Sequence, residues 1–337
     1  YIAALLADLS QVAHTVSRPV TSVFFGGGTP SLMTSEGFDA LMRGIGERVD
    51  LVHDAEITLE ANPGTVTEEK LAAFARSGVT RLSLGVQSFN EASLSFLGRI
   101  HTACQAREAV TWAKNTFAHV NIDMMYALAG QTLADLRADA EEAVSFNTDH
   151  LSYYELTIEP GSVFFKRPPE NLPDADTAGD MAECIQTITR KAGFDYYEVS
   201  AYAKAGSRCR HNMTYWTYGD YLAIGAGAHA KITTPDGAIF REVRAKSPVR
   251  YMTDVENGTF VQRRRRVRSE EIPFEFMLNV LRLREGVAKE RWEEATGLPY
   301  ALIAPKVASL QREGLMEKTD RLAATALGRR FLNTLQE

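Results

Sequence analysis

The chain has 337 residues, of which 45% are hydrophobic and 24% charged, a composition typical of a globular protein. Its formal net charge of −6 excludes a general electrostatic attraction to nucleic acids or anionic membranes. No apolar run reaches the ~20 residues that a membrane-spanning helix needs. The three cysteines lie far apart in the sequence, so we expect no disulfide framework and a cytoplasmic location; they are Cys104, Cys184 and Cys209.

Strand-like and helix-like segments alternate from the first residue to about Val199. The chain opens in a helical pattern, with Ile2, Leu5 and Leu9 on one face. The predicted strands are Val23–Phe25, Glu56–Glu60, Arg81–Gly85, Asn121–Tyr126, His150–Leu156 and Tyr196–Val199. The predicted helices between them are Glu36–Val49, Glu68–Arg76, Ala103–Lys114, Leu133–Val144 and Thr177–Lys191. Regular alternation of this kind predicts a parallel sheet, either open or curved into a barrel.

The rest of the chain has a different character. The stretch Thr233–Arg268 is rich in loop signals, and its basic run Arg263–Arg266 is most simply a solvated loop. Residues 269–337 are mostly helical in pattern, which suits a small helical or winged-helix domain. The predicted helices there are Glu275–Leu283, Lys289–Thr296, Ala301–Glu313 and Ala324–Leu335.

Unusual groups stand where the predicted strands end. Three glycines, Gly26–Gly28, follow the first strand, Glu60 ends the second, and Gln87 follows the third. Asp123 lies early in the fourth. Because the active and ligand-binding sites of parallel β/α folds lie at the carboxyl ends of the strands, we expect these groups to surround one binding cleft. Glycines admit backbone groups to an amino-acid head, and a carboxylate can accept both hydroxyls of a ribose.

Each of these residues also has a plainer interpretation. The glycines can form a tight turn without a ligand, and Glu60 alone can be a helix cap or a surface charge. His101 and His229 suit structural roles better than metal binding. The glycine turn is neither a P-loop nor a dinucleotide fingerprint, since both spacings are absent. The joint placement at successive strand ends favours a site.

A second cluster, SRCRHNMTYW at residues 207–216, brings together a thiol, an imidazole, two arginines and two aromatic rings. Heme iron takes axial histidine or cysteine, and arginines can hold heme propionates. His211 is the better candidate for the iron ligand and Cys209 the second. Arg208 and Arg210 are candidates for the propionates, and Tyr215 and Trp216 for stacking on the macrocycle. The alternative is a surface loop in which His211 makes local hydrogen bonds.

These motifs together resemble the radical S-adenosylmethionine proteins of the anaerobic coproporphyrinogen III oxidase family. The resemblance rests on FFGGGTPSLM, LEANPGT, RLSLGVQSFN, LGRIH and NIDMMY in that order. The segments YYELTIEPGSVF, YYEVSAYAKAG, CRHNMTYW and GDYLAIGAGAH narrow it to the HemW subfamily of heme chaperones. The C-terminal segments PFEFMLNVLRL and FLNTLQE resemble that family's C-terminal domain.

The resemblance implies an α/β fold, a partial (β/α)6 radical S-adenosylmethionine barrel, here without its first strand. It divides the chain into a barrel core at 1–232, a connecting region at 233–268 and a C-terminal domain at 269–337. S-adenosylmethionine would lie against a 4Fe-4S cluster, with the methionine head beside the triple glycine. The residues that the resemblance assigns to S-adenosylmethionine are Gly27, Gly28, Thr29, Glu60, Gln87, Arg99 and Asp123.

The chain departs from the family at two places. The cluster motif CxxxCxxC, which the family carries before FFGGGTP, does not occur in this sequence, and the three cysteines do not reproduce its spacing. We therefore expect no cluster ligands in this chain, either because the segment was cut off, which the non-Met start favours, or because this copy lost it. The family's Gly-Leu-Pro after NIDMMY reads Ala127-Leu128-Ala129, which we expect to leave Asp123 unaffected.

The resemblance implies a heme chaperone that delivers heme to an acceptor protein. The alternative is an oxygen-independent coproporphyrinogen III oxidase, which decarboxylates propionates by radical chemistry. The HNxxYW pattern favours the chaperone, and without CxxxCxxC we expect no radical chemistry from the chain as given. A third hypothesis, nucleic-acid binding through a C-terminal winged helix, is disfavoured because acidic and basic residues nearly balance in 269–337.

Overall fold

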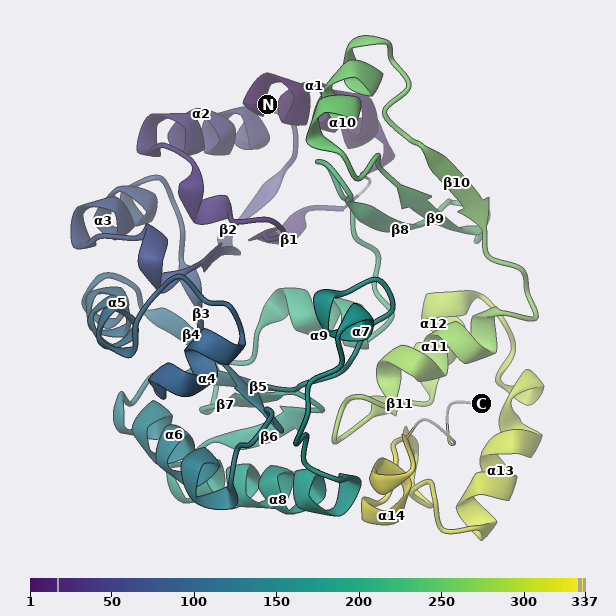
Figure 1. Cartoon of the computed structure of the whole chain (residues 1–337). Coiled ribbons are helices and arrows are strands. Elements are labelled where there is room, and N and C mark those ends of the chain that lie inside the picture. Colours follow the sequence, from purple (N-terminus) through teal and green to yellow (C-terminus); the bar gives the residue numbers. More distant parts are fainter. Residues whose placement is uncertain (17, 333–334, 336–337) are drawn as a thin grey trace. The chain divides into compact units, whose positions relative to one another are not determined.

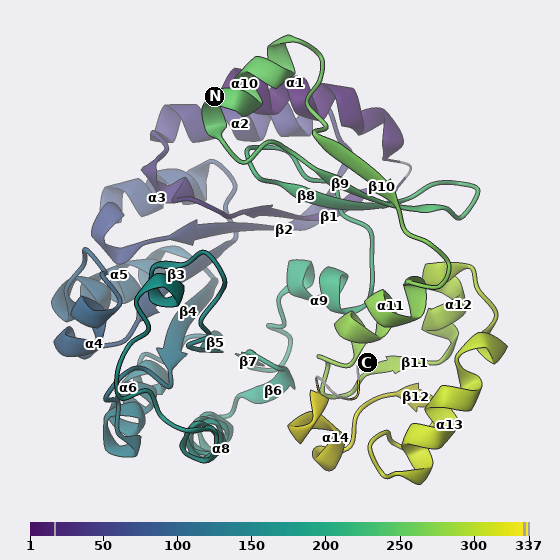
Figure 2. The same ribbon diagram turned by 45° about the vertical axis from the view of Figure 1, so that its right-hand side comes forward.

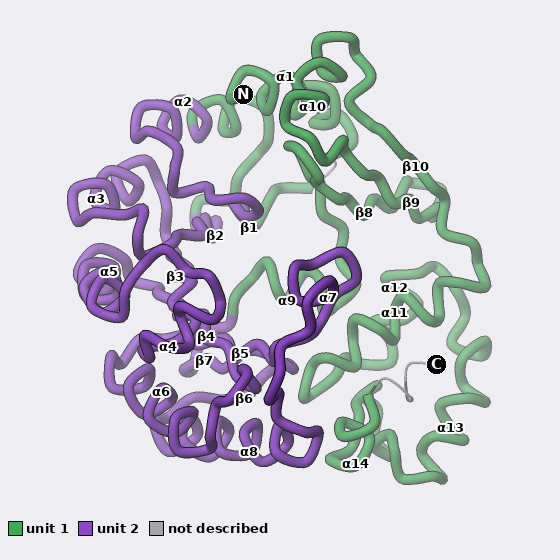
Figure 3. Tube along the Cα trace, in the orientation of Figure 1, with its two compact units in different colours: residues 1–21, 43–53, 209–337 green, residues 22–42, 54–208 purple. Residues whose placement is uncertain are grey.

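The computed structural model describes residues 1–16, 18–332 and 335, which divide into two compact units (Figure 3). The sheet unit consists of residues 22–42 and 54–208, and the terminal unit of residues 1–21, 43–53 and 209–337. Neither unit is continuous in the sequence, because the chain passes through the terminal unit between residues 43 and 53. No helix among the described residues has the length and apolar character needed to cross a membrane.

A curled half-barrel sheet of seven strands organises the sheet unit (Figure 1). Its order is β1-β2-β3-β4-β5-β7-β6, and β2 to β5 pair in parallel, whereas β7 pairs antiparallel with both β5 and β6. The strands are β1 (Val20–Phe25), β2 (Leu51–Ala61), β3 (Arg81–Gln87), β4 (His119–Tyr126), β5 (His150–Glu155), β6 (Asp195–Glu198) and β7 (Ala201–Ala203). The predicted α/β half-barrel is therefore confirmed, and the six predicted strands all form.

Helices connect the strands as the alternation predicts. The helices of the chain are α1 (Ile2–Val12), α2 (Ser35–Gly46), α3 (Glu68–Arg76), α4 (Glu91–Phe96), α5 (Ala103–Thr116), α6 (Leu133–Ser145), α7 (Val163–Lys166), α8 (Ala175–Lys191), α9 (Arg210–Trp216), α10 (Pro248–Glu256), α11 (Ile272–Val280), α12 (Glu290–Thr296), α13 (Ala304–Arg312) and α14 (Ala326–Arg330). Residues 333 and 334 of the predicted helix Ala324–Leu335 lie outside the described residues.

The two faces of the sheet differ in character. One face carries fully buried aliphatic side chains such as Leu59, Leu82 and Ile122, and the connecting helices cover it. Phe38 of α2 and Phe74 of α3 meet edge to face on that side, with ring centroids 5.1 Å apart. The burial of this apolar area is the main force that stabilises the unit. The other face carries polar side chains at the alternate positions of the same strands.

The terminal unit contains a second sheet of three antiparallel strands, in the order β10-β9-β8 (Figure 2). The strands are β8 (His229–Thr233), β9 (Ile239–Val243) and β10 (Arg263–Arg266). The interpretation of Arg263–Arg266 as a solvated loop is therefore wrong. A buried ion pair ties the residue that follows β9 to the N-terminal helix α1, since Asp8 and Arg244 are 0% and 1% exposed and 3.1 Å apart.

The C-terminal part of the terminal unit combines helices α11 to α14 with a short antiparallel pair, β11 (Val287–Ala288) and β12 (Arg321–Leu322). Trp292 of α12 is fully buried and meets Phe276 of α11 at right angles, with centroids 5.1 Å apart. The mostly helical character that the sequence predicts for residues 269–337 is therefore observed, and the β11–β12 pair accompanies the helices.

Candidate functional site

The glycine turn after β1 places a backbone N–H against Glu60. Gly27 and Gly28 adopt φ values of +76° and +63°, a left-handed conformation that favours glycine. The N–H of Gly27 donates to Oε2 of Glu60 over 3.2 Å. At Gly26, a Cβ would lie 2.3 Å from the ring of Phe24 and 3.1 Å from the carboxyl carbon of Glu60. The turn therefore needs glycine both for its conformation and for its approach to this carboxylate.

The strand register places Glu60 and Asp123 on the same face of the sheet. Glu60 of β2 is opposite Ser83 of β3, which is opposite Asn121 of β4, and Asp123 follows two positions later. Side chains two positions apart along a strand point to the same face. The structure therefore brings these two carboxylates together on the polar face, as the sequence analysis expects of them.

The electrostatics agree with this proximity. Burial raises the pKa of Glu60 above its ordinary value, the N–H of Gly27 partly offsets that effect, and the negative charge of Asp123 raises it further. The charge of Asp123 also raises the pKa of Tyr154, a residue of β5 that the sequence analysis did not select. Two carboxylates and a phenol thus face the same region, and a ligand with several hydroxyl groups suits such acceptors.

Gln87 ends β3 in a strained conformation. Its φ is +70°, unusual for a residue with a side chain, and the register between β3 and β4 shifts between Gly85 and Gln87. A Cβ at position 85 would lie 2.9 Å from Nε2 of Gln87, so glycine there makes room for the amide. Bulges and strained residues occur often beside binding sites.

The two remaining predicted residues lie in segments that follow β1 and α4. Thr29 is half-buried in the turn after the glycines, and Arg99 is exposed beyond the end of α4. Burial lowers the pKa of His101, the hydrogen bond to Val86 partly offsets that effect, and the charge of Arg99 lowers the pKa further. His101 itself is buried, with Nε2 3.1 Å from the carbonyl oxygen of Val86 and Nδ1 3.2 Å from Oδ1 of Asn62. The structural role predicted for His101 matches these contacts.

A hydrogen-bonded network supports Asp123 from behind. Nδ2 of Asn121 donates to Oδ1 of Asp123 and to Oγ of Ser83, both over 2.8 Å. Oδ1 of Asn121 accepts from Ser152 over 3.1 Å and lies 2.6 Å from Nδ1 of His150. Ser83 in turn donates to Oδ2 of Asp123 over 2.7 Å. The sequence did not predict this network. The one feature of the sequence that indicates it is the presence of polar residues at alternate positions of β3, β4 and β5.

In the terminal unit, Cys209 and His211 form a pair at the start of α9. Cys209 is buried at the N-cap position, and its Sγ lies 2.8 Å from Nδ1 of the half-buried His211. The ring of Tyr215, one helical turn further, lies 6.2 Å from that of His211. The predicted candidates for the iron ligand are thus adjacent, and His211 contacts a side chain rather than only backbone.

Arg208, the last residue of the sheet unit, is already engaged. Its Nη2 lies 2.8 Å from Oδ2 of Asp195, and its guanidinium lies over the ring of Tyr197 at 5.5 Å from the centroid. The prediction that Arg208 holds a propionate gains no support from this geometry, because such a contact would compete with an ion pair already made. His229 stands exposed at the start of β8.

The cysteines do not form a cluster site among the described residues. Cys104 is exposed on α5, Cys184 is buried on α8, and Cys209 precedes α9. A 4Fe-4S cluster is held by thiolates gathered around it. Among the described residues, the three thiols therefore belong to three different segments.

Comparisons with known proteins point in one direction. Residues 4–143 match the family model of the Radical SAM superfamily, and residues 267–331 match that of the HemN C-terminal domain. The chain is 41% identical over 336 residues to the heme chaperone HemW of Haemophilus influenzae, which covers 99% of this chain and 86% of that relative. It is also 41% identical over 340 residues to the heme chaperone HemW of Escherichia coli, which covers 100% of this chain and 89% of that protein.

Among solved structures, the coproporphyrinogen III oxidase HemN of Escherichia coli, a radical SAM enzyme, superposes with a TM-score of 0.82. The match covers 100% of this chain and 81% of that chain at 20% sequence identity. At this identity the likeness concerns the fold.

Proposed function

The chain belongs to the HemW family of radical S-adenosylmethionine proteins, and we propose that it binds heme and transfers it to an acceptor protein. The relatives of 41% identity are named heme chaperones, whereas the oxidase of similar fold is 20% identical. The chaperone is therefore better supported than the oxidase alternative. We also propose that the protein acts in the cytoplasm, the reducing compartment that suits a chain whose three cysteines lie far apart in the sequence.

The observation that carries the proposal is the Cys209–His211 pair. A histidine that binds a metal usually donates its other ring N–H to a nearby acceptor, which sets the tautomer and the orientation of the ring. Nδ1 of His211 lies 2.8 Å from Sγ of Cys209, so a proton on Nδ1 leaves the lone pair on Nε2. This arrangement supports His211 as the iron ligand and Cys209 as the residue that orients it.

We further propose that the polar face of the sheet unit binds S-adenosylmethionine. The polar groups of this face fit this ligand. The carboxylates of Glu60 and Asp123 can accept hydrogen bonds from ribose hydroxyls, and the glycine turn exposes backbone groups. Gln87, Thr29 and Arg99 complete the proposed pocket. We expect these 337 residues alone to bind S-adenosylmethionine weakly, because the family's cluster would otherwise hold the methionine amino and carboxylate groups.

Heme titration of the purified protein tests the proposal. We expect a Soret band in the wild type that shifts in His211→Ala, because one axial bond is lost while porphyrin contacts remain. Cys209→Ala should keep the band position and weaken binding modestly. His229→Ala, which removes an exposed histidine of the same unit, is the matched control and should behave as the wild type.

Other results would change the assignment. A spectrum altered by Cys209→Ala alone would make the thiolate the ligand. A wild type without heme binding would contradict the chaperone function. Vinyl product from coproporphyrinogen III, assayed without oxygen on a version of the protein that carries the cluster motif, would favour the oxidase instead.

A further inference from the structure

The basic run Arg263–Arg266 is split by the sheet into two pairs. As β10 pairs with β9, Arg263 is opposite Val243 and Arg265 is opposite Arg241. Because alternate residues of a strand point to opposite faces of the sheet, Arg263 and Arg265 share one face, and Arg264 and Arg266 lie on the other. Arg264 lies over the ring of Phe240, 4.4 Å from its centroid, and its Nε lies 3.4 Å from Glu242.

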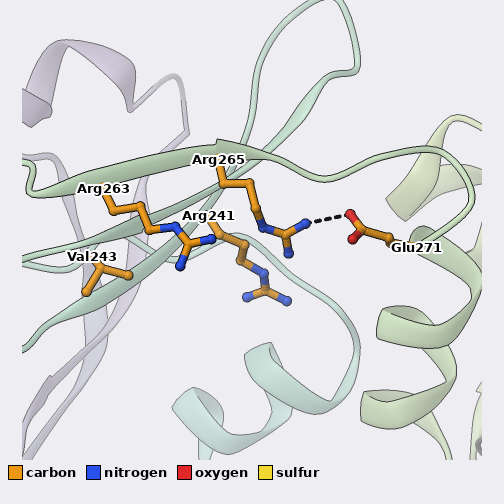
Figure 4. Close-up of a pocket in the computed structure, with 5 residues that line it drawn as sticks. All are labelled: Arg241, Val243, Arg263, Arg265 and Glu271. Carbon is orange, nitrogen blue, oxygen red and sulfur yellow. Dashed lines mark hydrogen bonds and ion pairs between the residues drawn. The ribbon is translucent and has the colours of Figure 1, made fainter.

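The face with Arg263 and Arg265 borders a pocket of about 400 Å³ (Figure 4). Its lining residues are Arg241, Val243, Arg263, Arg265 and Glu271. Pockets that hold small molecules begin at about 300 Å³, so this volume admits a ligand group of moderate size. Figure 4 shows the guanidinium groups of Arg241 and Arg263 extending into the same space, while Arg265 turns toward Glu271.

The charges in this pocket do not balance. Like charges directly opposite each other in a sheet destabilise it, and Arg241 and Arg265 are such a pair. Glu275 offsets this cost with contacts of 2.8 Å to Arg241 and 3.3 Å to Arg265. Arg263 has no ion pair among the described parts of the chain, and Glu271, the carboxylate among the lining residues, is paired with Arg265. A guanidinium without a counter-charge thus faces an open pocket, which is the chemistry of an anion site.

Aromatic side chains connect this pocket to the Cys209–His211 pair within the terminal unit. The hydroxyl of Tyr221 lies 2.9 Å from Nη1 of Arg241. The ring of Tyr221 packs against that of Tyr215 at 4.6 Å between centroids, and Tyr215 follows His211 on α9. The candidate iron ligand and the arginine pocket therefore border one continuous set of side chains.

We propose that the arginine pocket binds carboxylates, and that in the loaded protein these are the propionates of the heme held at His211. This inference rests on the proposed heme function. The planar guanidinium of Arg263 can take one carboxylate through two parallel hydrogen bonds, and Arg241 and Arg265 add positive charge. Val243 supplies an apolar wall beside them. Arg208, one of the two arginines that the sequence suggested for this role together with Arg210, is held by Asp195.

The experiment compares heme with heme dimethyl ester, in which both propionates are neutral. Both ligands are titrated against the wild type, Arg263→Gln and the control Arg266→Gln, which removes an exposed arginine of β10 from the opposite face. We expect the wild type to bind heme at least tenfold more tightly than the ester, since a hydrogen bond to a charged group contributes about one order of magnitude. Arg263→Gln should weaken heme binding roughly tenfold and leave ester binding and the Soret position unchanged.

The outcomes separate the two proposals. If Arg263→Gln binds heme as tightly as the wild type while His211→Ala shifts the Soret band, the propionate site is wrong and the heme function stands. If Arg263→Gln weakens the binding of heme and of the dimethyl ester equally, the propionate site is also wrong, because the arginine would then support the structure and not bind the carboxylate charge. If the wild type binds neither ligand, both proposals fail. Thermal unfolding of each variant verifies that the exposed substitution leaves the fold intact.

Discussion

The substitution Asn121→Asp tests the network behind Asp123 with almost no change in shape. Asn121 donates through Nδ2 to Asp123 and to Ser83, both over 2.8 Å. A carboxyl oxygen in place of Nδ2 cannot donate unless it carries a proton. The side chain is buried, so water cannot take over these contacts. We expect a destabilisation that depends strongly on pH.

The magnitude follows from the geometry. Two carboxylate charges 2.8 Å apart repel by about 6 kcal/mol at an effective dielectric constant of about 20. Binding a proton relieves this repulsion, at a cost of about 1.4 kcal/mol for each pH unit above the ordinary carboxyl pKa of about 3.9. That cost is about 1.5 kcal/mol at pH 5 and nearly 6 kcal/mol at pH 8. The lost bond to Ser83 adds about 1 kcal/mol at either pH.

The stability of the Asn121→Asp variant falls as the pH rises. The variant's new carboxyl and Asp123 share a proton in the folded state that the unfolded chain does not bind between pH 5 and 8, so stability falls as the pH rises. Relative to the wild type, we expect a loss of about 2 to 3 kcal/mol at pH 5 and about 7 kcal/mol at pH 8.

Urea unfolding followed by circular dichroism at both pH values measures this difference. Asn115→Asp, on the exposed face of α5, is the control and should change stability by less than about 0.5 kcal/mol. An Asn121→Asp variant with equal losses at pH 5 and pH 8, or a loss below about 1 kcal/mol at pH 8, would refute the assigned network.

Two further predictions concern the glycine turn and its carboxylate. Gly28→Ala should cost about 1 kcal/mol of unfolding free energy, because its φ of +63° disfavours alanine although nothing lies within 4 Å of the added methyl. Gly46→Ala at the end of α2, where φ is not positive, should be neutral or stabilising, and an equal loss there would contradict the conformational argument. Glu60→Gln should raise stability at neutral pH, because burial and then Asp123 raise the pKa of Glu60 and the folded state therefore favours its protonated form. The gain should shrink as the pH falls toward the raised pKa. Denaturant unfolding between pH 5 and 8 measures this gain, and a gain that stays constant over that range would contradict the assigned cause.

Local patterns in the sequence predict much of the fold. The alternation of apolar strands and amphipathic helices predicts a parallel α/β sheet, and all six predicted strands form. The residues at the strand ends could be found for the same reason, since the carboxyl ends of parallel strands share one edge. Cys209 and His211 could be paired in advance because only one residue of the chain lies between them.

The sequence was uninformative where contacts join distant segments. Four consecutive arginines show no alternation of apolar and polar residues, so Arg263–Arg266 resembles a loop until it is paired with β9. Its pairing partner begins more than twenty residues earlier, and the charges that offset it come from Glu271 and Glu275 of a following segment.

The support of Asp123 has the same origin. Asn121 and His150 are distant in the chain, and only the parallel register of β4 and β5 places their side chains 2.6 Å apart. The sequence by itself therefore determined which elements form and which chemical groups stand at their ends, because propensity and periodicity are local. The tertiary structure alone decided which of these groups meet and which charges remain unbalanced, because strand register and sheet pairing bring together residues that no local pattern relates.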